Sequence, residues 1–180
     1  MIDVDEVAKV VESYLEQNAS EHQRLAPLLA SLTRRTAITD RSTFTGHLTC
    51  SAILIDPAWR VLHIRHNTLG RWLRPGGHVE ASDVSLLDAA LREVEEETGI
   101  AAGVPRPIHD LLPLDIDVHP IPANPAKDEP DHQHFDLRYA FTVPGTPAVR
   151  LQAEEVNAAE WLPVEQVEPS VVRDKLLLLR

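Results

Sequence analysis

The sequence predicts an α/β (α+β) fold, a sandwich with a helical extension at its start. Short apolar runs with strand-like character lie between residues 47 and 163. Stretches with helical spacing lie before, among and after these runs, without the regular alternation of a repeated βαβ array. The chain of 180 residues suits one domain with a modest extension, and we divide it into residues 1–40 and 41–180.

Apolar residues at helical spacing predict four helices. We expect them over residues 3–17, 21–32, 84–97 and 170–179. Asp83 can cap the start of the third helix, and Gly99 can end it, because aspartate favours the N-cap and glycine the position after the last turn.

Buried-type apolar runs predict the strands. We expect them over residues 47–56, 60–66, 132–143 and 158–162. Residues 104–131 contain seven prolines, which predicts an extended loop interrupted by strand-like pieces such as residues 108–114. In folds of this kind such loops determine which ligand is bound.

Charge and cysteine content exclude several classes of function. The net charge is −11 at pH 7, so tight binding along a nucleic-acid backbone is disfavoured, whereas a small phosphorylated ligand stays compatible with a cation-screened site. The single cysteine, Cys50, cannot form a disulfide within one chain, which fits the cytoplasm. No apolar run reaches membrane-spanning length, and the acidic residues 3–6 do not fit a signal peptide. We therefore expect no membrane association.

Three glutamates share one face of the third expected helix. A helix turns by about 100° per residue, so Glu93, Glu96 and Glu97 fall on one narrow arc while Glu95 points elsewhere. Carboxylates this close repel one another, and a bound divalent cation relieves the repulsion. Mg²⁺ prefers oxygen ligands of this kind. An isolated acidic face is also compatible with plain solvation, so the neighbouring residues decide between the two interpretations.

The neighbouring residues resemble the signature of the Nudix hydrolase family, G-x5-E-x7-R-E-U-x-E-E-x-G-U, where U is aliphatic. The sequence matches it at Gly77, Arg92, Glu93, Val94, Glu96, Glu97, Gly99 and Ile100. The runs at 72–80 and 161–163 are also similar to Nudix chains. The resemblance covers residues 45–170 and implies a Nudix-like α/β/α sandwich with a mixed sheet.

The first half of the signature departs from the family pattern. Fourteen residues separate Gly77 from Arg92, where the pattern has thirteen. The first glutamate of the signature therefore falls on Asp83 or on Val84, depending on which end is aligned. We interpret this as a one-residue insertion in the loop, with Asp83 as the nearest acidic substitute.

The resemblance implies metal-dependent hydrolysis of a phosphoanhydride bond, either in a nucleoside diphosphate linked to another moiety or in a nucleotide. The substrate would be a small-molecule diphosphate and the cofactor Mg²⁺, with Mn²⁺ as the expected substitute. Glu93 and Glu97 would be the principal metal ligands, with Glu96 sharing that role and the Gly77 carbonyl adding an oxygen. Arg92 would hold one glutamate in its rotamer.

The general base is left open. A carboxylate must accept the proton of the attacking water within hydrogen-bond reach. Glu96 is one candidate, and Glu154 or Glu155, in the loop before the last strand, is another. We assign catalytic roles to Glu96, Arg92 and Glu155.

Further polar residues are expected to contact the substrate. His132, His134 and Asp136 alternate along one predicted strand, so they share a face that could line the cleft or bind a transition metal through His-x-His. His47 has no distinguishing feature, and we interpret it as a structural histidine. We assign substrate contacts to Arg74, His78, Glu80, His134 and Asp136.

Two other functions share the implied fold. An enzyme like isopentenyl-diphosphate isomerase needs a reactive cysteine, and the apolar neighbours of Cys50 disfavour an activated thiolate. A non-catalytic ligand sensor usually lacks the glutamates, which are intact here. The sequence does not identify the substrate or the number of metal ions. It also does not decide whether the extension shapes the pocket or a homodimer interface.

Overall fold

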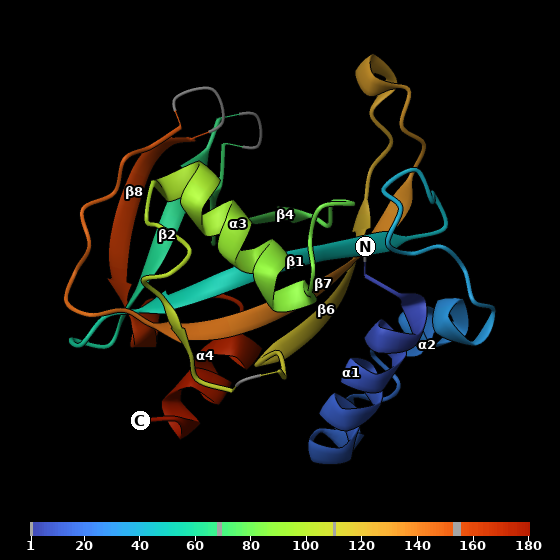
Figure 1. Ribbon diagram of the computed structural model, residues 1–180, viewed down its shortest axis with the longest axis horizontal. Helices are drawn as coiled ribbons and strands as arrows, with labels where there is room; N and C mark the ends of the chain where they lie inside the picture. Colours follow the sequence, from blue (N-terminus) through green and yellow to red (C-terminus); the bar gives the residue numbers. More distant parts are fainter. Residues whose placement is uncertain (1, 68–69, 110, 153–155) are drawn as a thin grey trace.

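The computed structural model describes residues 2–67, 70–109, 111–152 and 156–180 and shows a mixed α+β fold, as predicted (Figure 1). The helical elements are α1 (Val4–Gln17), η1 (Ala19–Glu21), α2 (Ala26–Thr33), α3 (Leu86–Thr98), η2 (Pro125–Lys127), η3 (Val164–Gln166) and α4 (Ser170–Leu178). The strands are β1 (His47–Ile55), β2 (Arg60–His66), β3 (Trp72–Leu73), β4 (Gly76–His78), β5 (Arg106–Pro107), β6 (Asp115–Ile121), β7 (His132–Thr142) and β8 (Val156–Pro163).

The described strands form one mixed sheet with β1 at its centre. β1 pairs in parallel with β7, in a register that sets His47 opposite His134, and antiparallel with β2 and β4. β7 also pairs antiparallel with β5 and β6, and β2 with β3 and β8. This arrangement brings the glycine-containing strand β4 alongside the middle of β1.

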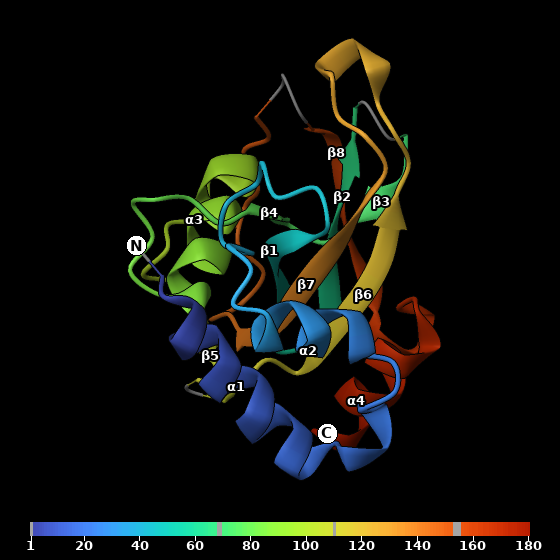
Figure 2. The same cartoon turned by 90° about the vertical axis from the view of Figure 1, so that its right-hand side faces the viewer.

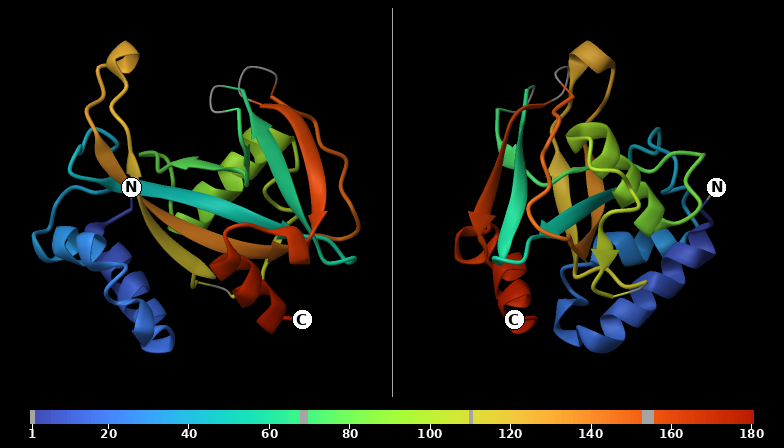
Figure 3. Two further views of the ribbon diagram at one scale, coloured as in Figure 1. Left: turned by 180° about the vertical axis from the view of Figure 1, so that it is seen from behind. Right: turned by 60° about the vertical axis from the view of Figure 1, so that its left-hand side comes forward.

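Every residue of β1 is buried, and helices lie on both faces of the sheet that contains it. Side chains of a strand alternate between faces. Ala52 and Leu54 belong to the core that includes Ala90 of α3, whereas Ile53 and Ile55 belong to a second core that includes α4. Figures 1 and 3 show α3 and α4 on opposite sides of the sheet. The predicted sandwich with a mixed sheet is confirmed.

The N-terminal helices pack on the same structure. Val7, Val11 and Tyr14 of α1 are buried in the core that also contains Phe135 of β7. Figure 2 shows α1 and α2 together at one end of the sheet, beside β6 and β7. The extension therefore shares a hydrophobic core with the sheet, and its treatment as a separate unit over residues 1–40 stays a prediction.

The proline-rich segment contains more strand than expected, and the predicted strand over residues 108–114 is wrong. The longer strand in this segment, β6, begins only at Asp115, and it contains Pro120. Among the described strands β6 pairs with β7 alone, so its other edge needs no hydrogen-bond donors. Pro120, which has no backbone N–H group, is therefore tolerated in this strand. Beyond β6 the chain forms an arm that carries η2 and extends away from the body (Figure 1).

Helix α3 begins at a different cap from the one predicted. Ser85, not Asp83, is the N-cap, and its side chain accepts a hydrogen bond from the Asp88 amide. Asp83 is instead buried and directed at Arg92. Gly99 ends the helix as expected, in the left-handed conformation with φ of 65°. Within the described ranges, no helix has both the length and the apolar composition needed to cross a bilayer.

Candidate active site

The glycine pair of β4 lies directly against the carboxylates of α3. The amide of Gly76 donates a hydrogen bond to Oε2 of Glu97 at 2.9 Å, and Glu97 is only 3% exposed. A Cβ atom added to Gly77 would lie 2.6 Å from Cδ of Glu93, closer than real contacts allow. The absence of a side chain at Gly77 lets the Glu93 carboxylate lie this close to the strand. The glycines therefore bring Glu93 and Glu97 to one edge of β4.

Alanine at each of the two glycines is expected to change the free energy of unfolding by a different amount, because the added Cβ atom would meet different neighbours. A Cβ on Gly76 would meet backbone atoms, Cys50 O and Ser51 Cα at 2.7 Å, whereas on Gly77 it would meet the flexible end of Glu93. We expect Gly76→Ala to lower the free energy of unfolding by about 1–3 kcal/mol because the strands must separate. Gly77→Ala should cost clearly less, because the Glu93 side chain can move. Urea unfolding of both variants measures the difference, and equal losses would contradict this assignment of contacts.

Arg92 forms the central ion pairs of the site. Its Nε donates to Asp83 Oδ1 at 2.9 Å, and its Nη2 donates to the His78 carbonyl at 2.8 Å. Its Nη1 donates to Glu93 at 2.8 Å and to Glu96 at 3.0 Å. Burial alone would lower the pKa of Arg92, but its hydrogen bonds to Asp83 and Glu93 outweigh burial and raise it. The guanidinium therefore stays charged and ties the signature loop to α3.

The three glutamates have different partners in the structure. In the part of the chain that the structure describes, no three carboxylates have oxygens that all lie within 4.8 Å of one another. Glu97 is directed at the Gly76 amide, whereas the side chain of Glu96 is 50% exposed and bonded to Arg92. Arg92, which the resemblance implied would hold one glutamate in its rotamer, donates hydrogen bonds to two of them, Glu93 and Glu96.

Two of the residues expected to contact substrate are histidines that lie close together. His78 and His134 lie side by side, with ring centroids 5.1 Å apart. Burial, together with the charges of Arg41 and His47, lowers the pKa of His78 to about 4. Burial and the neighbouring histidines lower the pKa of His134 to about 3. Both rings are therefore neutral at pH 7.

Asp136 is engaged with protein partners. It accepts hydrogen bonds from Ser51 at 2.6 Å, from Thr49 at 3.2 Å and from Nε of Arg138 at 2.9 Å. These contacts confirm that Asp136 and Arg138 share a face of β7, as the alternation predicts. Asp136 is only 8% exposed, so any contact with a ligand would come at the edge of this internal network.

Arg74 is also partly committed to the protein. Its Nη1 donates to the carbonyl of Glu168 at 2.8 Å, and its Nε is buried without a hydrogen-bond partner among the described residues. Burial and the nearby charge of Arg138 lower the pKa of Arg74 to about 10, so it is still a cation at pH 7. The side chain is thus a half-buried positive charge whose buried Nε has no hydrogen-bond partner in the described part of the chain.

The remaining assigned residues are exposed or fall outside the described residues. The side chain of Glu80 is 58% exposed, and its carboxylate lies 4.0 Å from Nη1 of Arg92. Glu154 and Glu155, the alternative general bases, lie outside the residues that the structure describes.

Cys50 is fully buried at the centre of β1. Burial, and secondarily the charge of Asp136, raises the pKa of its thiol well above the usual value. A buried thiol with a raised pKa is a poor nucleophile. This observation disfavours chemistry that depends on a reactive cysteine.

Comparison with known proteins identifies the family. Residues 45–179 match the NUDIX domain, so the chain belongs to the Nudix hydrolase family, as the signature residues predicted. It is 36% identical over 101 residues to a probable DHNTP pyrophosphohydrolase of Lactococcus lactis subsp. cremoris. That alignment includes 56% of this chain and 52% of the relative, so the chain matches about half of the relative's length.

Solved structures show the same fold at low sequence identity. An Ap4A hydrolase of C. elegans superimposes with a TM-score of 0.56 at 15% identity, over 73% of this chain and 96% of that one. The dihydroneopterin triphosphate pyrophosphohydrolase of E. coli gives 0.55 at 15% identity, over 73% and 92%. A NUDIX family hydrolase of Clostridium perfringens gives 0.56 at 20% identity, over 74% and 98%.

Proposed function

We propose that this chain is a divalent-metal-dependent pyrophosphohydrolase. It would cleave a phosphoanhydride bond in a small molecule that resembles a nucleoside diphosphate or nucleotide. The observation that carries the proposal is the contact between the glycine pair of β4 and two carboxylates, the half-buried Glu93 and the buried Glu97. Membership of the Nudix family and the names of its relatives support the same class of reaction.

The residues fit a hard divalent cation. Mg²⁺ commonly binds one or two carboxylates together with water and substrate phosphates. Glu93 and Glu97 would supply the carboxylates, Glu96 would join them, and the Gly77 carbonyl would add a neutral oxygen. A bound Mg²⁺ would neutralise part of the diphosphate charge and lower the pKa of a water ligand. Mn²⁺ accepts the same ligands, so it should substitute.

The protein residues would perform the remaining tasks. Arg92 would keep Glu93 and Glu96 in position through the hydrogen bonds already formed. Glu96, being half exposed, or Glu155 would accept the proton of the attacking water. Arg74, His78, Glu80, His134 and Asp136 would line the part of the cleft that receives the rest of the substrate.

The chemistry that the relatives' names share supports this substrate class. The Lactococcus and E. coli proteins are named for dihydroneopterin triphosphate or its abbreviation, and the C. elegans protein for Ap4A. Both names denote a heterocycle that carries a polyphosphate chain. The net charge of −11 disfavours extended nucleic acid as an alternative. We further propose a cytoplasmic location, with a homodimer as the candidate assembly.

A substrate panel with metal control tests this function. Nucleoside triphosphates, sugar nucleotides, dinucleoside polyphosphates and non-nucleotide diphosphates are incubated with Mg²⁺ or Mn²⁺, and the products are separated. We expect release of phosphate, pyrophosphate or a nucleoside monophosphate from at least one class. Chelation should lower that rate by at least about 100-fold, and added metal should restore it. Isomerisation without phosphate release, or no turnover of any class, would count against the proposal.

A further inference from the structure

Five histidines gather at the end of the sheet that is next to the arm. His47 begins β1, His132 and His134 begin β7, and His78 ends β4. The ring centroid of His47 lies 4.8 Å from that of His132 and 4.8 Å from that of His134. His119 of β6 lies 5.6 Å from His134. The parallel pairing of β1 with β7 is what brings residues so distant in the sequence together.

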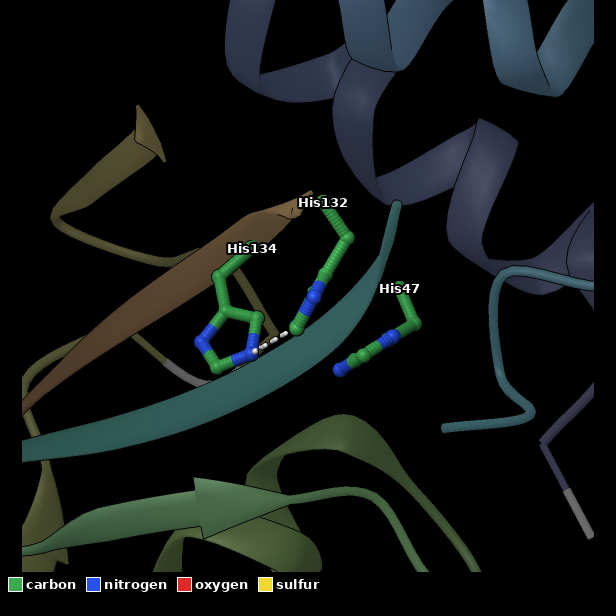
Figure 4. A group of neighbouring side chains, drawn as sticks. All are labelled: His47, His132 and His134. Atoms are coloured by element: carbon green, nitrogen blue, oxygen red, sulfur yellow. Dashed lines mark hydrogen bonds between the residues drawn. The ribbon is translucent and has the colours of Figure 1, made fainter. Parts of the chain in front are cut away.

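We propose that His47, His132 and His134 form a binding site for a borderline divalent transition-metal ion such as Zn²⁺, separate from the carboxylate site on α3. Figure 4 shows the three rings side by side at the start of β1 and β7. One ligand atom from each lies within 4.8 Å of the other two, and no other group of three does so in the described part of the chain.

The separation of the two β7 rings matches metal geometry. Nε2 of His132 lies 3.3 Å from Nε2 of His134. Two nitrogens that are each about 2.0–2.1 Å from a tetrahedral Zn²⁺ are roughly 3.3 Å apart. Neutral imidazole is also a preferred ligand of Zn²⁺, and of Cu²⁺ and Ni²⁺, whereas Mg²⁺ prefers oxygen. The cluster therefore selects a different class of ion from the glutamates.

Backbone carbonyls fix the tautomers of two rings in the form that a metal requires. Nδ1 of His132 lies 2.8 Å from the Pro130 carbonyl, and Nδ1 of His47 lies 3.3 Å from the Thr43 carbonyl. A carbonyl only accepts, so both Nδ1 atoms carry the proton and both Nε2 atoms present a lone pair. A carbonyl bonded to the second ring nitrogen is the usual support of a metal-binding histidine.

The Nε2 atom of His47 is buried and has no hydrogen-bond partner among the described residues, although the residue is only 2% exposed. A buried polar atom without a partner is costly, and such atoms are rare in folded proteins. A cation bound by this lone pair would satisfy it. The interpretation of His47 as an ordinary structural histidine is thus not supported by its surroundings.

The binding of a metal ion also requires that the proton on Nε2 of His134 move to the other ring nitrogen. Without metal, His134 can donate its Nε2 proton to the lone pair of His132 across the 3.3 Å contact. On binding, that proton moves to Nδ1 of His134, so the ring coordinates through Nε2 with no net proton release. Three histidines leave a fourth position for water or an anionic ligand. One of the three rings, His132, borders a pocket of about 370 Å³ together with Phe44 and Ile121.

Direct metal binding tests the proposal independently of hydrolysis. The full chain, purified without a histidine tag, is titrated with Zn²⁺ by calorimetry, and with Co²⁺ while the visible absorption of tetrahedral Co²⁺ is followed. We expect one tight site in the wild type. His47→Gln and His132→Gln should each weaken it by at least about 100-fold, because each removes a ligand.

Two control variants distinguish this site from other groups that could bind Zn²⁺. His22→Gln, at an exposed histidine outside the cluster, and Glu97→Gln, at the carboxylate site, should both keep the tight Zn²⁺ site. Circular dichroism shows whether each variant is folded, and the two cluster variants test the site independently. Equal Zn²⁺ affinity in the wild type and His47→Gln, or loss of the site in Glu97→Gln, would overturn the proposal. Neither result depends on whether the chain hydrolyses a diphosphate.

Discussion

Glu97→Gln is expected to lower turnover by roughly 10²–10³-fold while the fold survives. The substitution removes the negative charge that would bind the cation, and it keeps the size of the side chain. The glutamine carbonyl can still accept the hydrogen bond that Gly76 donates to Glu97 at 2.9 Å. The structural contact is therefore preserved while the electrostatic one is lost.

Turnover of the best substrate at saturating Mg²⁺ measures this effect, with a thermal melt to confirm folding. Glu95→Gln is the matched control, because Glu95 lies on the exposed side of the same helix and, among the described residues, its carboxylate accepts a hydrogen bond only from the Ala102 amide. We expect near-normal turnover there. If Glu97→Gln turned over substrate at a rate close to that of the wild type, Glu97 could not be a principal metal ligand.

Residues close together in the sequence were the easiest to predict. Glu93, Glu96 and Glu97 share a helix whose spacing can be read directly, and Gly99 ends it as glycine usually does. The strands β1, β2 and β7 were predictable for the same reason, because each is a continuous run of apolar or alternating residues. Local periodicity therefore defined the helix that carries the carboxylates.

Contacts between distant segments could not be predicted in this way. β4 is only three residues long and contains two glycines, so its pairing with β1 has no periodicity to reveal it. His47 has no other histidine close to it in the sequence, and its three-dimensional neighbours come from the parallel pairing of β1 with β7. A histidine at the start of each of two runs was the available indication, but the sequence does not show that the runs pair in parallel.

The buried charge network around Asp115 is a further example. Asp115 has a fully buried side chain, and three cations surround it: Arg24 at 3.1 Å, Arg138 at 3.0 Å and Lys175 at 2.8 Å. They come from the N-terminal extension, β7 and α4, at sequence separations of 91, 23 and 60 residues. One carboxylate thus joins three parts of the fold, and through Arg138 it reaches Asp136 in the polar face of the sheet.

Asp115→Asn is therefore expected to lower the free energy of unfolding by about 3–5 kcal/mol, because it leaves three cations without their shared anion. Urea unfolding measures the loss. Asp174→Asn is the control, since that side chain is 70% exposed and its change should stay within about 0.5 kcal/mol. A loss of under about 1 kcal/mol in Asp115→Asn would contradict the role of the network.

The lowered pKa of Asp115 also predicts how the free energy of unfolding changes at acid pH. Burial alone would raise the pKa of Asp115, but the hydrogen bond from Lys175 and the charges of Lys175, Arg138 and Arg24 outweigh it and lower the pKa. An aspartate whose folded pKa lies below its unfolded value of about 3.9 contributes stability above that pH. The contribution disappears as the pH falls through the folded pKa. The difference in unfolding free energy between wild type and Asp115→Asn should therefore be largest near neutral pH and shrink below about pH 4. A difference that is constant from pH 7 to acid would show that the loss comes from packing, not from charge.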